Sequence, residues 1–238
     1  SHYNMGVVFY EINDYQNAIN CYEKTLKIDP NFVLAIFNLG MIYKKKNNFL
    51  YAQKYFEKAI SIQPNYVNAY NALGVLFMEL KEYNNSKEYL LKAIKIDSFY
   101  LDAYINLSLV YEKLNEPLRA INSINMAIEI YPNYANPHYM KGRLCFESKE
   151  FFDSLTHFYK ALQIDPNHIL CLNYLIQTIK LTSLTNLNIN DIANFRKYYL
   201  FLFKNLIISH SEISYNAILF LLETDNYTQI KTIFNSNS

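Results

Sequence analysis

The sequence has no surplus of either charge and no long apolar run, and each absence excludes a class of partner. Lysine plus arginine (22) nearly equals aspartate plus glutamate (21), so no basic surplus is available to neutralise nucleic-acid phosphates or anionic lipids. The longest apolar stretch, 198–208, contains Lys204 and is shorter than the roughly 20 residues that span a bilayer. We therefore expect neither nucleic acid nor a membrane as a partner.

Cysteine is also scarce. Cys21, Cys145 and Cys171 are odd in number, and none lies in the CxxC spacing of a zinc site or a redox pair. We expect reduced thiols in the protein core, which favours a cytoplasmic or nuclear location.

Motifs that carry enzyme chemistry are missing too. The four glycines form no phosphate-binding loop, and no serine lies in a GxSxG motif. The five histidines form no HExxH or other close metal-ligand pair. His138 stands where neighbouring segments carry Tyr70 and Tyr104, so we expect it to pack in the core. The sequence thus predicts no cofactor, no metal site and no catalytic activity in this chain, although the chain could be part of an enzyme.

The few glycines and prolines are instead arranged with a fixed period. Gly6, Gly40, Gly74 and Gly142 are separated by multiples of 34 residues, and Ser108 fills the missing position. Pro30, Pro64, Ser98, Pro132 and Pro166 follow the same interval. Glycine inside a helix costs about 1 kcal/mol relative to alanine. Its recurrence in register therefore indicates that two helices approach closely there.

Two apolar stripes with helical spacing fill each period. Leu39 and Tyr43 flank the small residue of a first helix, and Ala52, Phe56 and Ala59 mark a second helix. The sequence predicts the break between the two helices at Asn47-Asn48 in one unit and at Asn84-Asn85 in the next. Pro117 is expected at the start of a second helix, where its missing N–H is harmless.

The pattern of Leu39, Gly40, Tyr43, Ala52, Phe56, Ala59 and Pro64 resembles the tetratricopeptide repeat family, with Ile36 replacing the first aromatic residue. The resemblance implies an all-α fold, a right-handed superhelical solenoid of helix-turn-helix repeats. We expect five regular 34-residue units over 1–168, the first truncated at its N-terminus. A degenerate sixth repeat with a long polar turn is expected over 169–210, and a partial seventh repeat or capping helices over 211–238. Because both ends fall inside repeats, we also expect either a piece of a longer protein or a chain with little room for caps.

The resemblance further implies that the first helices line a concave groove that holds an extended or helical peptide. The predicted groove residues are Phe37, Asn38, Met41, Lys45, Asn71, Val75, Met78, Ile105, Asn106, Leu109, Lys113, Asn136, Tyr139, Arg143 and Phe146. This mixture of apolar and amide side chains suits a hydrophobic segment whose backbone the amides can bond. The alternative is that several of these side chains pack between neighbouring first helices.

Three functions fit such a chain. The first is a non-catalytic protein-interaction scaffold that binds a protein or peptide in the groove. The second is the substrate-targeting arm of an O-linked sugar transferase, because Asn4, Asn38, Asn106 and Asn216 resemble the asparagine ladder of such arms, although Ala72, Met140 and Tyr174 interrupt it. The third is a structural subunit of a large assembly. The carboxylate clamp of chaperone-binding repeats is not expected, because Tyr3, Val7, Phe37 and Met41 occupy its first positions.

The helix predicted around Tyr198–Ile207 is apolar around most of its circumference. Such a helix is expected to be buried on both sides. We therefore expect it to contact another helix, a second copy of the chain or further sequence, with a thick local core as the alternative.

Overall fold

A computed structural model describes residues 1–181, and every regular element in this part of the chain is an α-helix. The helices are α1 (His2–Glu11), α2 (Tyr15–Ile28), α3 (Val33–Lys45), α4 (Phe49–Ile62), α5 (Val67–Glu79), α6 (Tyr83–Ile96), α7 (Leu101–Lys113), α8 (Pro117–Ile130), α9 (Ala135–Glu147), α10 (Phe151–Ile164) and α11 (Ile169–Leu181). The chain divides into unit 1, Ser1–Tyr131, and unit 2, which begins at Pro132.

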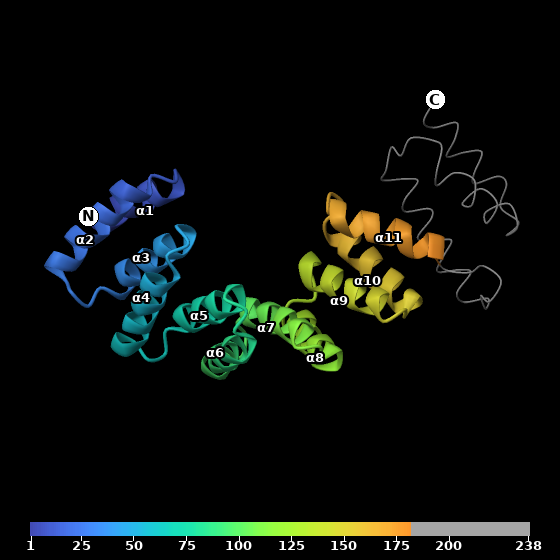
Figure 1. Cartoon of the computed structure of the whole chain (residues 1–238). Coiled ribbons are helices and arrows are strands. Elements are labelled where there is room, and N and C mark those ends of the chain that lie inside the picture. The colour runs from blue at the N-terminus through green and yellow to red at the C-terminus, as the bar shows by residue number, and fades with distance from the viewer. Residues whose placement is uncertain (182–238) are drawn as a thin grey trace, which may run out of the picture. The chain divides into compact units, whose positions relative to one another are not determined.

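Unit 1 is a stack of four helix pairs, α1–α2, α3–α4, α5–α6 and α7–α8 (Figure 1). Each helix contacts the next one along the chain, and the first helices also contact one another, α3 with α5 and α5 with α7. In unit 2, α9 and α10 form a pair, and α11 packs against both. Within residues 1–181, each unit is therefore an all-α stack of helix-turn-helix repeats, as the sequence predicted.

The glycines lie where the two helices of a pair cross. A Cβ atom added at Gly40 would lie 2.6 Å from the Phe56 ring, and one at Gly142 would lie 2.6 Å from the Phe158 ring. Such distances are far inside van der Waals contact, so any side chain there would push the second helix away. The structure confirms that these glycines permit close helix approach.

The turn inside each repeat depends on one residue in the left-handed region. Asn13, Asn47, Lys81, Asn115 and Lys149 have φ between 56° and 63°, and each lies 34 residues after the last. This conformation reverses the chain so that the next backbone N–H reaches back to the end of the first helix, as Asn48 N does to Tyr43 O at 2.9 Å. Asparagine adopts it more easily than lysine does.

The predicted break at Asn84-Asn85 is wrong. Helix α5 ends at Glu79 and α6 begins at Tyr83, so both asparagines lie in the first turn of α6. The left-handed residue is Lys81, in register with Asn47. The turn was predicted at the Asn-Asn pair because asparagine favours turns. Its actual position follows the 34-residue register. The break at Asn47-Asn48 is correct, because α3 ends at Lys45 and α4 begins at Phe49.

The turns between repeats are stabilised by aspartate side chains. Asp29, Asp97 and Asp165 each accept a hydrogen bond from the backbone N–H two residues on, at 2.9 to 3.1 Å. This local bond gives the backbone an alternative to continuing the helix. Pro117 begins α8, as predicted, where it removes no helical hydrogen bond.

The core repeats with the same period. Tyr22, Phe56, Leu90, Ile124 and Phe158 are fully buried, and each follows the small residue of its repeat by 16 positions. The three cysteines are buried and unpaired, as predicted. Burial raises the pKa of Cys145 to about 11 and that of Cys171 to about 12, so both remain protonated thiols at neutral pH.

Several predictions concern residues outside the described part of the chain. These are the long polar turn and second helix of the sixth repeat, the partial seventh repeat, the apolar helix around Tyr198–Ile207, and Asn216 of the asparagine ladder.

Candidate functional site

The first-helix face of unit 1 consists of the predicted groove residues on α3, α5 and α7. Its members are Phe37, Asn38, Met41, Lys45, Asn71, Val75, Met78, Ile105, Asn106, Leu109 and Lys113. All of them are at least partly exposed to solvent. Because α5 contacts both α3 and α7, the structure brings these residues onto three adjacent helices.

Side-chain amides link the first helices of this face. The Nδ2 group of Asn106 on α7 donates to Oδ1 of Asn71 on α5 at 2.9 Å. A hydrogen bond between half-buried amides fixes the rotamers of both side chains and the spacing of the two helices. The amides are therefore presented in a defined orientation.

Tyr100 and Asn68 extend this polar link, and the sequence analysis did not single them out. Tyr100, in the turn before α7, donates its hydroxyl to Oδ1 of Asn68 on α5 at 2.8 Å. Burial, followed by nearby Asp102, raises the pKa of Tyr100 to about 12, so the hydroxyl stays protonated. A sequence signal existed, because Phe32, Tyr66, Tyr100, Tyr134 and His168 form a ladder of rings with the 34-residue period.

Asn38 on α3 bonds to tyrosines from the preceding helix pair. Its Nδ2 group donates to the hydroxyl of Tyr22 at 3.2 Å and to that of Tyr3 at 3.5 Å. Burial raises the pKa of Tyr22 to about 12, so its hydroxyl also stays protonated. Asn38 is thus held by α1 and α2 while remaining partly exposed.

The Phe37 side chain packs between repeats and is also partly exposed on the first-helix face. Its ring lies 5.5 Å from that of Phe56 and 5.3 Å, edge to face, from that of Tyr66, measured between centroids. Both distances are typical of aromatic pairs that stabilise a core. Met41 also packs against the core cluster that contains Phe56. The packing alternative therefore applies to part of each of these side chains, and the rest is exposed.

Charged side chains lie at the C-terminal ends of the first helices, some on this face and some beside it. Lys44 on α3 forms an ion pair of 2.8 Å with Glu79 on α5. Lys45 and Lys113 are exposed in the last turns of α3 and α7, where positive charge complements the helix dipole. The middle of the face is left apolar and amide-rich.

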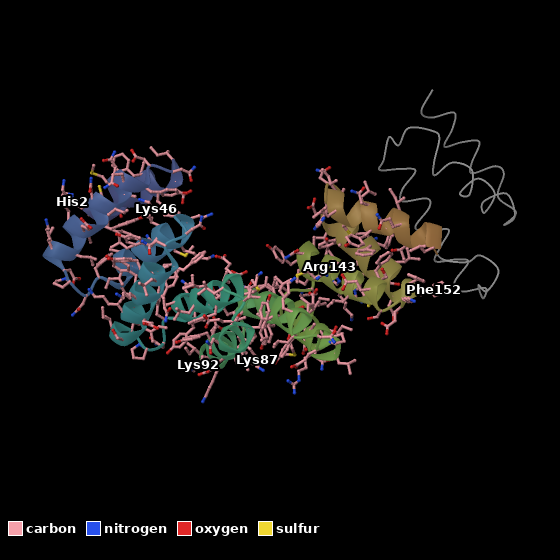
Figure 2. The ribbon with its side chains drawn as sticks, viewed as in Figure 1. His2, Lys46, Lys87, Lys92, Arg143 and Phe152 are labelled. Carbon is pink, nitrogen blue, oxygen red and sulfur yellow. The ribbon has the colours of Figure 1, made fainter. Side chains whose placement is uncertain are left out.

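Unit 2 carries the other four predicted residues on α9, and three of them take part in local contacts. The Tyr139 ring packs 4.6 Å from His168 and 6.2 Å from Phe158. Phe146 contacts the rings of Phe151 and Tyr174. Arg143, marked in Figure 2, pairs with Glu147 on the same helix at 2.7 Å. Asn136 is partly exposed.

His138 packs in the core as predicted. It is 4 % exposed, and its Nε2 atom lies 2.9 Å from the carbonyl oxygen of Pro132. Tyr70 and Tyr104 donate to the corresponding carbonyls of Pro64 and Ser98. Among the described residues, no group of three or more histidine, cysteine or acidic side chains is arranged to hold a metal ion.

The second helices present a different surface. They carry charged side chains such as Lys87 and Lys92 on α6 (Figure 2), together with exposed apolar side chains such as Leu50, Leu91 and Leu118. None of the helices within 1–181 combines the length and apolarity needed to cross a membrane.

Comparison with solved structures gives proteins of the same fold. A crystal structure of the MamA protein has 26 % sequence identity and a TM-score of 0.58, covering 71 % of this chain and 92 % of that one. YrrB, described as a TPR protein with an unusual peptide-binding site, has 22 % identity and a TM-score of 0.56, with 72 % and 89 % covered. PilF of Pseudomonas aeruginosa has 18 % identity and a TM-score of 0.69, with 94 % of both chains covered.

Sequence comparison identifies the family. Models of the tetratricopeptide repeat match residues 1–32, 33–66, 67–100 and 101–134, which together are more than half of the 238 residues. A search of curated proteins found no match. The chain belongs to the tetratricopeptide repeat family, and it is a protein-interaction scaffold.

Proposed function

We propose that the first-helix face of unit 1 binds a segment of another protein, in extended or helical form. The observation that carries the proposal is that half-buried, hydrogen-bonded amides and partly exposed apolar side chains alternate over three adjacent first helices. A face used only for packing would bury these groups.

The amides favour recognition of a peptide backbone. The hydrogen bonds of Asn38 and Asn106 use their Nδ2 groups as donors, which leaves Oδ1 of each available as an acceptor. An extended segment offers backbone N–H groups that such oxygens can accept. Because the side chains are already fixed, binding costs little further rotamer entropy.

The apolar members favour a partner with hydrophobic side chains. Val75 and Met78 on α5 and Ile105 and Leu109 on α7 are partly exposed. Burying such side chains contributes about 25 cal/mol per Å² of apolar surface. The flexible thioether of Met78 can adapt to different side-chain shapes. Lys45 and Lys113 favour an acidic residue at one end of the bound segment.

Unit 2 carries a second set of candidate binding residues, which is more aromatic. Tyr139 and Phe146 are partly exposed while they pack with neighbouring rings, and Asn136 and Arg143 lie on the same helix. Rigid aromatic side chains with polar neighbours are typical anchors of protein interfaces. YrrB, a protein of the same fold, is described as having an unusual peptide-binding site.

The test is a selection of binding peptides from a random library, followed by affinity measurements on two matched variants. The face variant carries Asn38→Ala, Ile105→Glu and Asn106→Ala. The control variant carries Asn20→Ala, Leu91→Glu and Asn122→Ala, three exposed positions on second helices. Selected peptides should bind the face variant at least about tenfold more weakly and the control variant with unchanged affinity.

Circular dichroism checks that both variants keep the helical content of the unmodified chain. If the selected peptides bind the face variant as tightly as the unmodified chain, the first-helix face is not the binding site. A loss confined to the control variant would place the site on the second helices and favour a subunit that assembles through lateral surfaces.

The transferase-arm alternative has no specific support in unit 1. Ala72 occupies the ladder position between Asn38 and Asn106, and it is 7 % exposed. Asn38 and Asn106 bond to neighbouring helices rather than forming a continuous row. A nucleotide-sugar-binding α/β domain in a longer form of the protein would restore this alternative.

A further inference from the structure

Two histidines of unit 2 replace a tyrosine pair of unit 1. His138 on α9 and His157 on α10 lie 68 residues, or two repeats, after Tyr70 and Tyr89. The two histidine rings lie 5.7 Å apart and the two tyrosine rings 6.4 Å apart, measured between centroids. His138 also forms a hydrogen bond through Nε2 with the carbonyl oxygen of Pro132, and the Tyr70 hydroxyl donates to the carbonyl oxygen of Pro64.

The histidine pair is joined by a hydrogen bond between like atoms. Nδ1 of His138 and Nδ1 of His157 are 3.4 Å apart. The Pro132 carbonyl can only accept, so Nε2 of His138 carries a proton. Neutral His138 then has a lone pair on Nδ1, which accepts the Nδ1–H of neutral His157. The bond therefore requires a defined tautomer of each ring.

The surroundings disfavour positive charge on either ring. Burial, then the nearby lysines, lowers the pKa of His157 to about 4, and burial also lowers the pKa of His138. The charged groups acting on the pair from within unit 2 are Lys141 on α9 and Lys160 on α10, both positive. No carboxylate of the described part of unit 2 compensates them.

A doubly protonated pair cannot keep its bond. Both Nδ1 atoms would then carry a proton and face each other, with two lysines adding repulsion. A tyrosine pair has no such transition, because tyrosine remains neutral throughout the acidic range.

We propose that His138 and His157 make the contact between α9 and α10 acid-sensitive, so that unit 2 loosens at an acidity that leaves the equivalent contact of unit 1 intact. Because the folded-state pKa values are lowered, the full stability of the pair is present above the unfolded pKa of about 6.5. It is lost as the pH falls from there toward 4. Helix α9 also carries Tyr139 and Arg143, so a partner bound to these residues would be released. This release rests on the proposed function. The acid response of α9 and α10 does not.

Hydrogen–deuterium exchange of the full chain at several pH values, corrected for intrinsic rates, tests the proposal. Each histidine that stays neutral in the folded state weakens protection about tenfold per pH unit below 6. Amides of α9 and α10 should lose protection on this scale, whereas those of α5 and α6 should not. The variant His138→Tyr/His157→Tyr, which installs the pair of unit 1, should remove the difference.

An NMR titration of the imidazoles in the unmodified chain covers the case in which the tyrosine variant fails to fold. Both rings should titrate below the ordinary imidazole pKa of about 6.5. Titration of either ring at or above this value, or an acid response of α9 and α10 that survives the tyrosine replacement, would overturn the proposal.

Discussion

The helix pairs α5–α6 of unit 1 and α9–α10 of unit 2 share one backbone frame but carry different side chains at equivalent positions. Gly74 faces the flexible Leu90, whereas Gly142 faces the flat ring of Phe158. Ser86 donates a hydrogen bond of 2.6 Å to the Gly74 carbonyl, whereas the equivalent Ser154 makes none with a described residue. The register thus fixes where helices cross and turn, and the residues at each position set the local chemistry.

The same contrast holds at the ends of the first helices. Lys44 of unit 1 pairs with a carboxylate, and Phe146, three repeats later, packs among aromatic rings. Lys141 in unit 2 stands where unit 1 has Leu39, Leu73 and Leu107. At these two positions, unit 2 therefore carries a lysine in place of a leucine and an aromatic ring in place of an ion-paired lysine.

The largest expected effect is at the helix crossing. Gly142→Ala should destabilise unit 2 by about 2 kcal/mol, because the new Cβ meets a ring that cannot move, and this overcomes the better helix propensity of alanine. The Gly142→Ser/Phe158→Ile double variant, which copies Ser108 and Ile124 of unit 1, should be more stable than Gly142→Ser alone. Denaturant unfolding followed by circular dichroism measures both. If the losses of stability from Gly142→Ser and Phe158→Ile simply add in the double variant, the Phe158 ring is not what excludes a side chain at position 142.

The buried serines should respond with opposite signs. Ser86→Ala removes a buried hydrogen bond and should cost about 1 kcal/mol. Ser154→Ala removes a buried hydroxyl without a bonded partner among the described residues, and it should stabilise unit 2 by about 0.5–1 kcal/mol. Thermal unfolding of the two single variants tests the difference. A loss of stability on both substitutions would show that Ser154 has a partner, such as a bound water.

The left-handed turn residues offer a smaller gain in both units. Lys81→Asn and Lys149→Asn should each stabilise the chain by about 0.5–1 kcal/mol, because asparagine tolerates the φ of 62° and 63° found there. Asn47→Lys, the reverse change at an equivalent turn, should destabilise by a similar amount. Urea unfolding midpoints give both values. Equal stability of all three variants would mean that the turns carry no strain.

Sequence reasoning identified the repeat, the helix pairs and the crossing glycines, because each depends on residues spaced 34 apart. It missed the turn at Lys81, because lysine carries no turn preference and only the register places it. On the candidate face it selected Asn38 and Asn106, but not Asn68 and Tyr100. Their bond joins residues 32 apart in sequence, and it depends on the packing of two consecutive repeats. The histidine pair was equally hidden, because 19 residues separate the two rings.

The smallest expected effect concerns the ion pair between repeats of unit 1. Lys44 is 20 % exposed and Glu79 40 % exposed, so solvent screens much of their attraction. Glu79→Gln should cost about 0.5 kcal/mol at low salt and almost nothing at 1 M salt, where the Debye length is about 3 Å. Phe146→Leu in unit 2 serves as the control, because the cost of losing aromatic packing should not decrease with added salt. If Glu79→Gln lowers the free energy of unfolding equally at both salt concentrations, Glu79 stabilises unit 1 by packing rather than by charge.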